Sequence, residues 1–157
     1  MEENEINQNL PETRNEFHKV RLCVLMTESW LGESMRSFFD AYDITAQQYH
    51  IMRIVQHAEK PLSILQIRER MLEKMCDASR LIDRLILKEL VIKKVAQFDK
   101  RLVEVFLTER GEALLTSIKE NIAELDKPIE SNLSEQEAKT MCTLLLKMKG
   151  CNSKLDS

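Results

Sequence analysis

The chain has few of the residues that interrupt regular structure. Its 157 residues include only 3 Gly and 3 Pro. Aromatic residues are also few, at 5% of the chain. This scarcity excludes a long flexible linker and a low-complexity tract, and we find no internal repeat with a period of roughly 20 to 50 residues. We therefore expect one compact, mostly helical domain.

The sequence also lacks a membrane segment and a cysteine framework. No apolar run approaches the ~20 residues that cross a bilayer, and the N-terminal Met-Glu-Glu-Asn-Glu-Ile is acidic rather than signal-like. Four cysteines are scattered without C-x-x-C pairs: Cys23, Cys76, Cys142 and Cys151. We expect a cytoplasmic protein with reduced thiols and no membrane partner.

Motifs for catalysis are missing as well. His18, His50 and His57 do not have the spacing of metal ligands, and there is no glycine-rich phosphate loop or nucleophile motif. We therefore expect neither an enzyme nor a bound cofactor.

Positive charge is concentrated in the middle of the chain. The net charge is −3, but residues 62–110 hold 11 Lys/Arg against 8 Asp/Glu, and the remainder is correspondingly acidic. The central segment is therefore the candidate for contact with an anionic partner.

Three capping patterns predict where helices begin. Thr45 with Gln48, Ser63 with Gln66, and Ser134 with Glu137 each have the Ser/Thr-x-x-Glu/Gln spacing. They predict helices from about 45 to 58, 63 to 71 and 134 to 149. Apolar periodicity predicts a longer first helix over about 13–40, kinked near Gly32.

A fourth helix, expected over about 76–89, has two distinct faces. Ala78, Leu81, Ile82 and Leu85 form an apolar face, while Asp77, Arg80, Arg84 and Lys88 form a charged one. With the helix before it and a brief turn between, this segment predicts a helix-turn-helix.

A hairpin is expected directly after this helix. The runs 90–95 and 102–107 are rich in Val, Ile, Leu and Phe, which suits paired strands, and the turn between them carries Asp99, Lys100 and Arg101. A basic hairpin beside a basic helix can contact neighbouring DNA grooves or phosphates. The predicted fold class is mainly α with a small β-hairpin wing, a winged helix-turn-helix.

The last third of the chain is expected to be helical, from Thr108 to about Asp126 and again from Ser134, with Pro128 between. It carries more apolar positions than a small wing domain needs, including Leu114, Leu115, Ile118, Ile122, Leu125, Met141, Leu144, Leu145 and Met148. We expect residues 1–40 and 111–157 to form a homodimer interface around a DNA-binding region at 41–110.

Three motifs together resemble the MarR family of bacterial transcriptional regulators. A wing D-x-R with a following L-T-x-x-G is matched by Asp99-Lys-Arg101 and Leu107-Thr-Glu-Arg-Gly111. The recognition-helix pattern S/T-R-x-x-x-x-L is matched by residues 79–85, and L-T-x-x-Q by Ile44-Thr-Ala-Gln-Gln48. The chain departs from the family at two positions, with Glu89 where Gly is frequent and Arg68 where Ala is frequent, so a left-handed corner at position 89 is not assumed.

The resemblance implies a set of DNA-binding residues. Ser79, Arg80 and Arg84 would face the major groove, Arg101 would enter the minor groove, and Asp99 would orient the wing. Lys74 and Lys100 would contact phosphates. Taken singly, each basic residue is equally well explained as a solvated surface group.

Two kinds of signal sensing remain open. Many relatives release DNA when a small aromatic ligand fills an apolar cleft, which Trp30, Phe38, Tyr49 and His57, with Phe39 and Tyr42, would line here. Another branch senses hydroperoxides through a cysteine in the first helix, near the position of Cys23. Because Ala46 stands where that branch has a Tyr, a buried, inert Cys23 is the expected state, and Cys76 is a lesser candidate.

The sequence therefore predicts a homodimeric repressor on double-stranded DNA, at an inverted repeat with half-sites about one turn, ~10 bp, apart. One alternative is a thiol-based regulator of the same fold using Cys23. Another, of a different class, is a helical protein-interaction module without DNA binding, which would show no salt-dependent affinity for duplex DNA.

Overall fold

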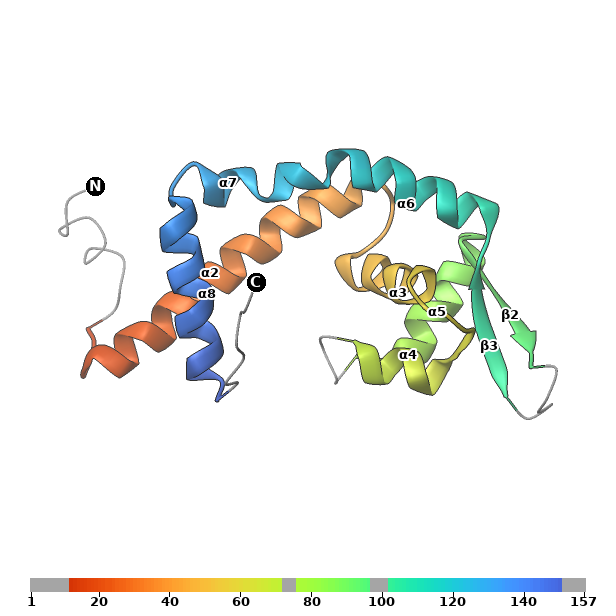
Figure 1. Ribbon diagram of the computed structural model, residues 1–157, viewed down its shortest axis with the longest axis horizontal. Helices are drawn as coiled ribbons and strands as arrows, with labels where there is room; N and C mark the ends of the chain where they lie inside the picture. Colours follow the sequence, from red (N-terminus) through yellow and green to blue (C-terminus); the bar gives the residue numbers. More distant parts are fainter. Residues whose placement is uncertain (1–11, 72–75, 97–101, 151–157) are drawn as a thin grey trace. The chain divides into compact units, whose positions relative to one another are not determined.

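A computed structural model describes residues 12–71, 76–96 and 102–150 (Figure 1). They form two compact units, which divide between Leu115 and Thr116 and are described separately below. Within the described segments, no helix is both long enough and apolar enough to traverse a lipid bilayer.

The first unit holds most of the regular structure, in the order α2 (Glu16–Asp40), α3 (Ala46–Gln56), β1 (Leu62–Ser63), α4 (Ile64–Arg70), α5 (Ala78–Leu87), β2 (Val91–Val95), β3 (Val103–Leu107) and the first part of α6 (Glu109–Asn121). The strands form an antiparallel sheet in the order β1-β3-β2. The predicted winged helix-turn-helix, mainly α with a small β-hairpin, is confirmed.

The predicted helix starts are confirmed by their hydrogen bonds. At Thr45 and at Ser63 the hydroxyl oxygen accepts from the backbone N–H three residues later, and the Gln side chain at that position accepts from the cap's own N–H. These reciprocal bonds satisfy N–H groups that have no partner inside the helix. Helix α5 begins at Ala78, two residues later than expected, because Asp77 caps it by accepting from Arg80 N.

The core of the first unit lies between these helices and the sheet. Its largest fully buried side chains are Phe39, Ile51, Met52, Ile67, Ile82, Leu85, Val91 and Val105. They come from α2, α3, α4, α5, β2 and β3, so the helix-turn-helix and the hairpin share one core. The strand β1 was not anticipated; its Leu62 pairs with Val105 of β3.

The second unit contains the end of α6, the 3-10 turn η1 (Ile122–Leu125), α7 (Lys127–Glu130) and α8 (Glu135–Met148). The helix expected to continue to Asp126 is α-helical only to Asn121. Pro128 lies between α6 and α8 as predicted, but it stands in the first turn of the short helix α7, which was not anticipated, where a missing N–H costs nothing. The capping box at Ser134 is confirmed.

Candidate nucleic-acid interface

Helix α5 is amphipathic in the way that the sequence predicts. Its inner side chains, Ala78, Leu81, Ile82 and Leu85, are all buried. Ser79, Arg80, Asp83 and Arg84 are exposed on the other side. The buried face fixes α5 on the core, and the exposed face carries two guanidinium groups that the core does not use.

The hairpin follows α5 after a short corner. Strands β2 and β3 are paired from Val91 with Leu107 to Val95 with Val103, and Ala96 N donates to Leu102 O at 3.0 Å beyond the last pair. The wing residues Asp99, Lys100 and Arg101 lie outside the described residues, as does Lys74. Their roles therefore stay predictions, whereas the strands that lead to the wing are confirmed.

The corner between α5 and β2 has a left-handed residue without being glycine. Glu89 has φ +58°. Its N–H donates to Ile86 O at 2.9 Å, and Leu90 N donates to Leu85 O at 3.0 Å. These two bonds form a Schellman motif, which closes the helix and usually employs Gly at the left-handed position. The corner is thus left-handed despite the Glu, a conformation that the sequence alone left open.

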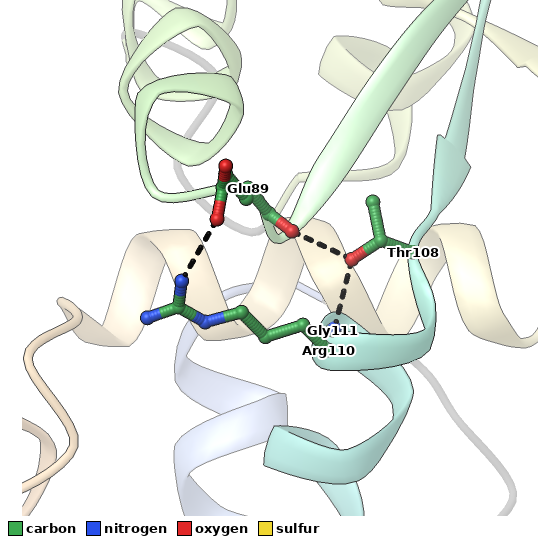
Figure 2. Close-up of polar contacts among 4 residues, drawn as sticks. All are labelled: Glu89, Thr108, Arg110 and Gly111. Carbon is green, nitrogen blue, oxygen red and sulfur yellow. Dashed lines mark hydrogen bonds and ion pairs between the residues drawn. The ribbon is translucent and has the colours of Figure 1, made fainter.

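The base of the wing is fastened to this corner by polar contacts (Figure 2). The Thr108 hydroxyl donates to Glu89 O at 2.7 Å and accepts from Gly111 N at 3.0 Å. Arg110 Nη1 lies 3.1 Å from Glu89 Oε2. The end of α5 and the first turn of α6 are therefore tied together through both the backbone and the side chain of Glu89.

Gly111 is required by the same contacts. A Cβ built at this position would overlap the carbonyl oxygen of Leu90 and lie 3.1 Å from Leu107 Cδ2. Thr108 N also donates to Leu90 O at 3.1 Å. The motif Leu107-Thr-Glu-Arg-Gly111 is therefore explained by packing: Thr108 caps α6, and Gly111 allows the helix to approach the corner.

The same end of α5 is anchored to the turn between α2 and α3 by a lysine. Lys88 Nζ lies 2.9 Å from Asp43 Oδ2 and donates to the carbonyl oxygen of Asp43. Asp43 also has a positive φ, +53°, in the turn between α2 and α3. Lys88 is thus engaged inside the unit and is less available to an external partner than the exposed Arg80 and Arg84.

Two neighbouring lysines on β2 point to opposite sides of the sheet. Lys93 Nζ donates to Asp83 Oδ1 at 2.6 Å, so it faces α5. Lys94 Nζ lies 5.2 Å from the centre of the Phe106 ring on the other side. Sequence reasoning named neither Asp83 nor Lys93, although strand alternation predicts that adjacent side chains diverge.

The residues predicted to line a ligand cleft are only partly brought together. Phe39 contacts Phe38 and Tyr49, with ring centres 5.1 and 4.9 Å apart, and Phe38 also contacts Tyr42. Trp30 is half exposed. No contact between this aromatic cluster and Trp30 or His57 is recorded among the described residues, so the set as a whole stays a prediction.

An open cavity of about 450 Å³ lies elsewhere, lined by Thr45, Gln48, Arg84 and Lys88 together with Asp40, Asp43, Ile44 and Leu87. None of the four residues predicted to bind a ligand belongs to its lining. Its charged groups of both signs do not match the apolar cleft expected for an aromatic ligand.

The cysteines give no support to redox sensing. Cys23 and Cys76 are free and half-buried, and Cys142 is free and exposed. Cys23 is thus less buried than expected, and its sensing role stays a prediction. In the described part of the chain, no cluster of three or more His, Cys, Asp or Glu has a geometry suited to a metal ion.

The arrangement of α4, α5 and the β2–β3 hairpin defines a winged helix-turn-helix protein. No family model matches the chain. Comparison with characterised proteins finds the HTH-type transcriptional regulator MhqR of Bacillus subtilis, 29% identical over 139 residues that cover 86% of this chain and 93% of the relative.

Solved structures share the fold. A MarR-like transcription regulator from Bacillus cereus has a TM-score of 0.77 at 18% identity, covering 88% of this chain and 99% of that one. A MarR mutant from Escherichia coli complexed with operator DNA has a TM-score of 0.77 at 23% identity, with the same coverage. The predicted resemblance to the MarR family is therefore confirmed at the level of the fold, and the relative found by sequence is a helix-turn-helix transcriptional regulator.

Proposed function

We propose that this chain is a DNA-binding transcriptional regulator that acts as a homodimer on an inverted repeat. The observation that carries the proposal is the exposed face of α5, where Ser79, Arg80 and Arg84 have no role in the core. Guanidinium groups on a helix of this kind bind guanine edges or phosphates in the major groove.

The hairpin supports the same proposal. Strands β2 and β3 extend from the end of α5, and the chain between them carries Asp99, Lys100 and Arg101. A basic wing beside a recognition helix would contact the adjacent minor groove or backbone. The relatives are helix-turn-helix transcriptional regulators, and one similar structure is complexed with operator DNA.

The dimer is supported by apolar surface on both terminal segments. On α8, Met141, Leu144, Leu145 and Met148 are exposed, and on α2 so are Phe17, Leu25 and Trp30. Twofold symmetry would place two α5 helices on half-sites about one turn, ~10 bp, apart. Occupying such an operator would repress transcription, and a small aromatic ligand bound near Phe38 and Tyr49 would release the DNA.

Salt-dependent DNA binding tests the proposal. Duplexes would first be selected by the wild-type protein from a random library and then titrated by gel shift at two salt concentrations. Arg80→Ala and Arg84→Ala should each weaken binding by about tenfold or more, since one good base contact is worth roughly 1–3 kcal/mol. A variant that loses a phosphate contact should also lower the salt slope by about 0.9.

Lys119→Ala is the matched control, because Lys119 is an exposed basic residue on α6 and belongs neither to α5 nor to the β2–β3 hairpin. It should bind the selected duplex as the wild type does. If the wild type selects no duplex, or if both arginine variants bind unchanged, the chain is not a DNA-binding regulator that uses α5.

A further inference from the structure

An acidic residue stands in the middle of the proposed DNA-binding face. Asp83 shares the exposed side of α5 with Ser79, Arg80 and Arg84, and its side chain is 61% exposed. A carboxylate there repels DNA phosphates, so an isolated Asp83 would oppose the binding that its neighbours favour.

Lys93, on strand β2, neutralises the negative charge of Asp83. Its Nζ lies 2.6 Å from Asp83 Oδ1, and its side chain is 29% exposed. On β2 it lies opposite the buried Val105 of β3, so it extends from the sheet face that packs on α5. The ion pair therefore joins the recognition helix to the strand that leads into the wing, at no net charge.

We infer that Asp83 and Lys93 are specificity-determining positioning residues: their ion pair fixes the wing strand relative to the recognition helix, so that both elements fit one DNA sequence together. The inference rests on the proposed function. A contact at either element alone tolerates many sequences, whereas two contacts held at a fixed separation accept only DNA that satisfies both.

Variants that replace each charged side chain by a neutral one distinguish the effect of the ion pair on geometry from the effect of its charges on DNA affinity. Asp83→Asn leaves the positive charge of Lys93 without a counter-charge, so it should tighten binding to a scrambled duplex. The slope of log binding constant against log salt concentration should become steeper by about 0.9. Lys93→Met leaves Asp83 uncompensated and should weaken binding to the same duplex. The double variant has the same net charge as the wild type, and should therefore bind scrambled DNA equally well.

The double variant should nevertheless lose discrimination. The ratio of its dissociation constants for scrambled and selected duplexes should fall by about tenfold, the size of one mismatched base pair. Lys93→Arg preserves the pair with Asp83 and should retain the wild-type ratio. A role confined to folding stability would not change this ratio while leaving binding to scrambled DNA intact.

Lys94→Met is the matched control, since it removes the same charge from the adjacent residue on the opposite sheet face. It should retain the wild-type ratio. The inference is overturned if the double variant also retains that ratio, or if Lys94→Met lowers it equally. If the wild type selects no sequence at all, the proposed function itself fails, which is a distinct result.

Discussion

Gly111 is the residue at which backbone packing leaves no room for a side chain. The carbonyl oxygen of Leu90 occupies the position that a Cβ would need, and this oxygen already accepts from Thr108 N. The backbones of Leu90 and of Gly111 meet at this contact, and neither can move without opening the corner between α5 and β2. Gly32 in α2 is the opposite case, because nothing lies within 4 Å of a Cβ built there.

Substitution of the two glycines should have opposite effects on stability. Gly111→Ala should lower the free energy of unfolding by about 1–3 kcal/mol, the usual cost of forcing extra volume into a packed site. Gly32→Ala should raise it by about 0.5–1 kcal/mol, because Ala loses less backbone entropy in a helix. Urea denaturation of both variants measures this, and equal effects would refute the packing argument.

Glu89 shows where residue-level reasoning from sequence stops. The frequent glycine of related chains suggests a left-handed corner, and its replacement leaves the conformation undecided. In the structure the hydrogen bonds from Glu89 N and Leu90 N, with the Thr108 hydroxyl on Glu89 O, hold the corner left-handed. The first two bonds are local, but Thr108 is 19 residues away in sequence, so no local pattern could supply its bond to the corner.

Elements with a local start signal were predicted well. The capping boxes at Thr45, Ser63 and Ser134 form within four residues of sequence, and all three are present. The apolar alternation of the hairpin and the two faces of α5 are local signals as well. These features define most of the candidate interface.

Elements that depend on distant partners were missed or misjudged. Strand β1 has only two residues, too few to show alternation, and it exists because β3 pairs with it. The directions of Lys93 and Lys94 depend on the β2–β3 register and on where α5 lies. The end of α6 at Asn121, whose side chain donates to Ser117 O at 3.0 Å, has no stop signal in the sequence.

The capping box of α8 makes a prediction about pH. The Ser134 hydroxyl donates to Glu137 Oε2 at 2.6 Å and Ser134 N donates to it at 2.9 Å. These bonds favour the ionised carboxylate and hold the pKa of Glu137 below its usual 4.5. The stabilisation that they give is therefore present above about pH 4.5 and is lost as pH falls through the lowered pKa.

Ser134→Ala should raise the pKa of Glu137, because it removes the hydroxyl donor, the larger of the two causes. An NMR titration of the Glu137 side-chain carboxyl carbon in both proteins measures the shift. Thr143→Ala, which removes a hydroxyl elsewhere on the same helix, is the matched control and should leave the titration of Glu137 unchanged. An unchanged Glu137 titration in Ser134→Ala would show that the box is open in solution.

At the scale of the whole molecule, apolar surface is left exposed where a partner would cover it. Met141, Leu144 and Met148 on α8 are about half exposed, at 47%, 59% and 54%. They recur at spacings of three and four, so they share one side of the helix. A stripe of this kind on a charged helix is typical of an interface with another copy of the chain.

Leu144→Asp should therefore convert the proposed homodimer into a monomer and remove high-affinity DNA binding, since each monomer would hold one half-site alone. Analytical ultracentrifugation and gel shift on the selected duplex measure the two effects. Lys139→Asp places the same acidic group elsewhere on α8 and should keep the dimer. If the wild-type protein is a monomer, the proposed homodimer is wrong, but the proposed contact of α5 with DNA is not contradicted.

Ser63 performs two tasks with one residue. It is the last residue of β1, paired with Glu104, and also the cap of α4. No loop separates the strand from the helix, so no residue at this junction can absorb an insertion or a deletion. An inserted residue would rotate α4 by about 100° against the sheet and turn its buried Ile67 away from the interior. Changes in chain length at this point are therefore incompatible with the fold.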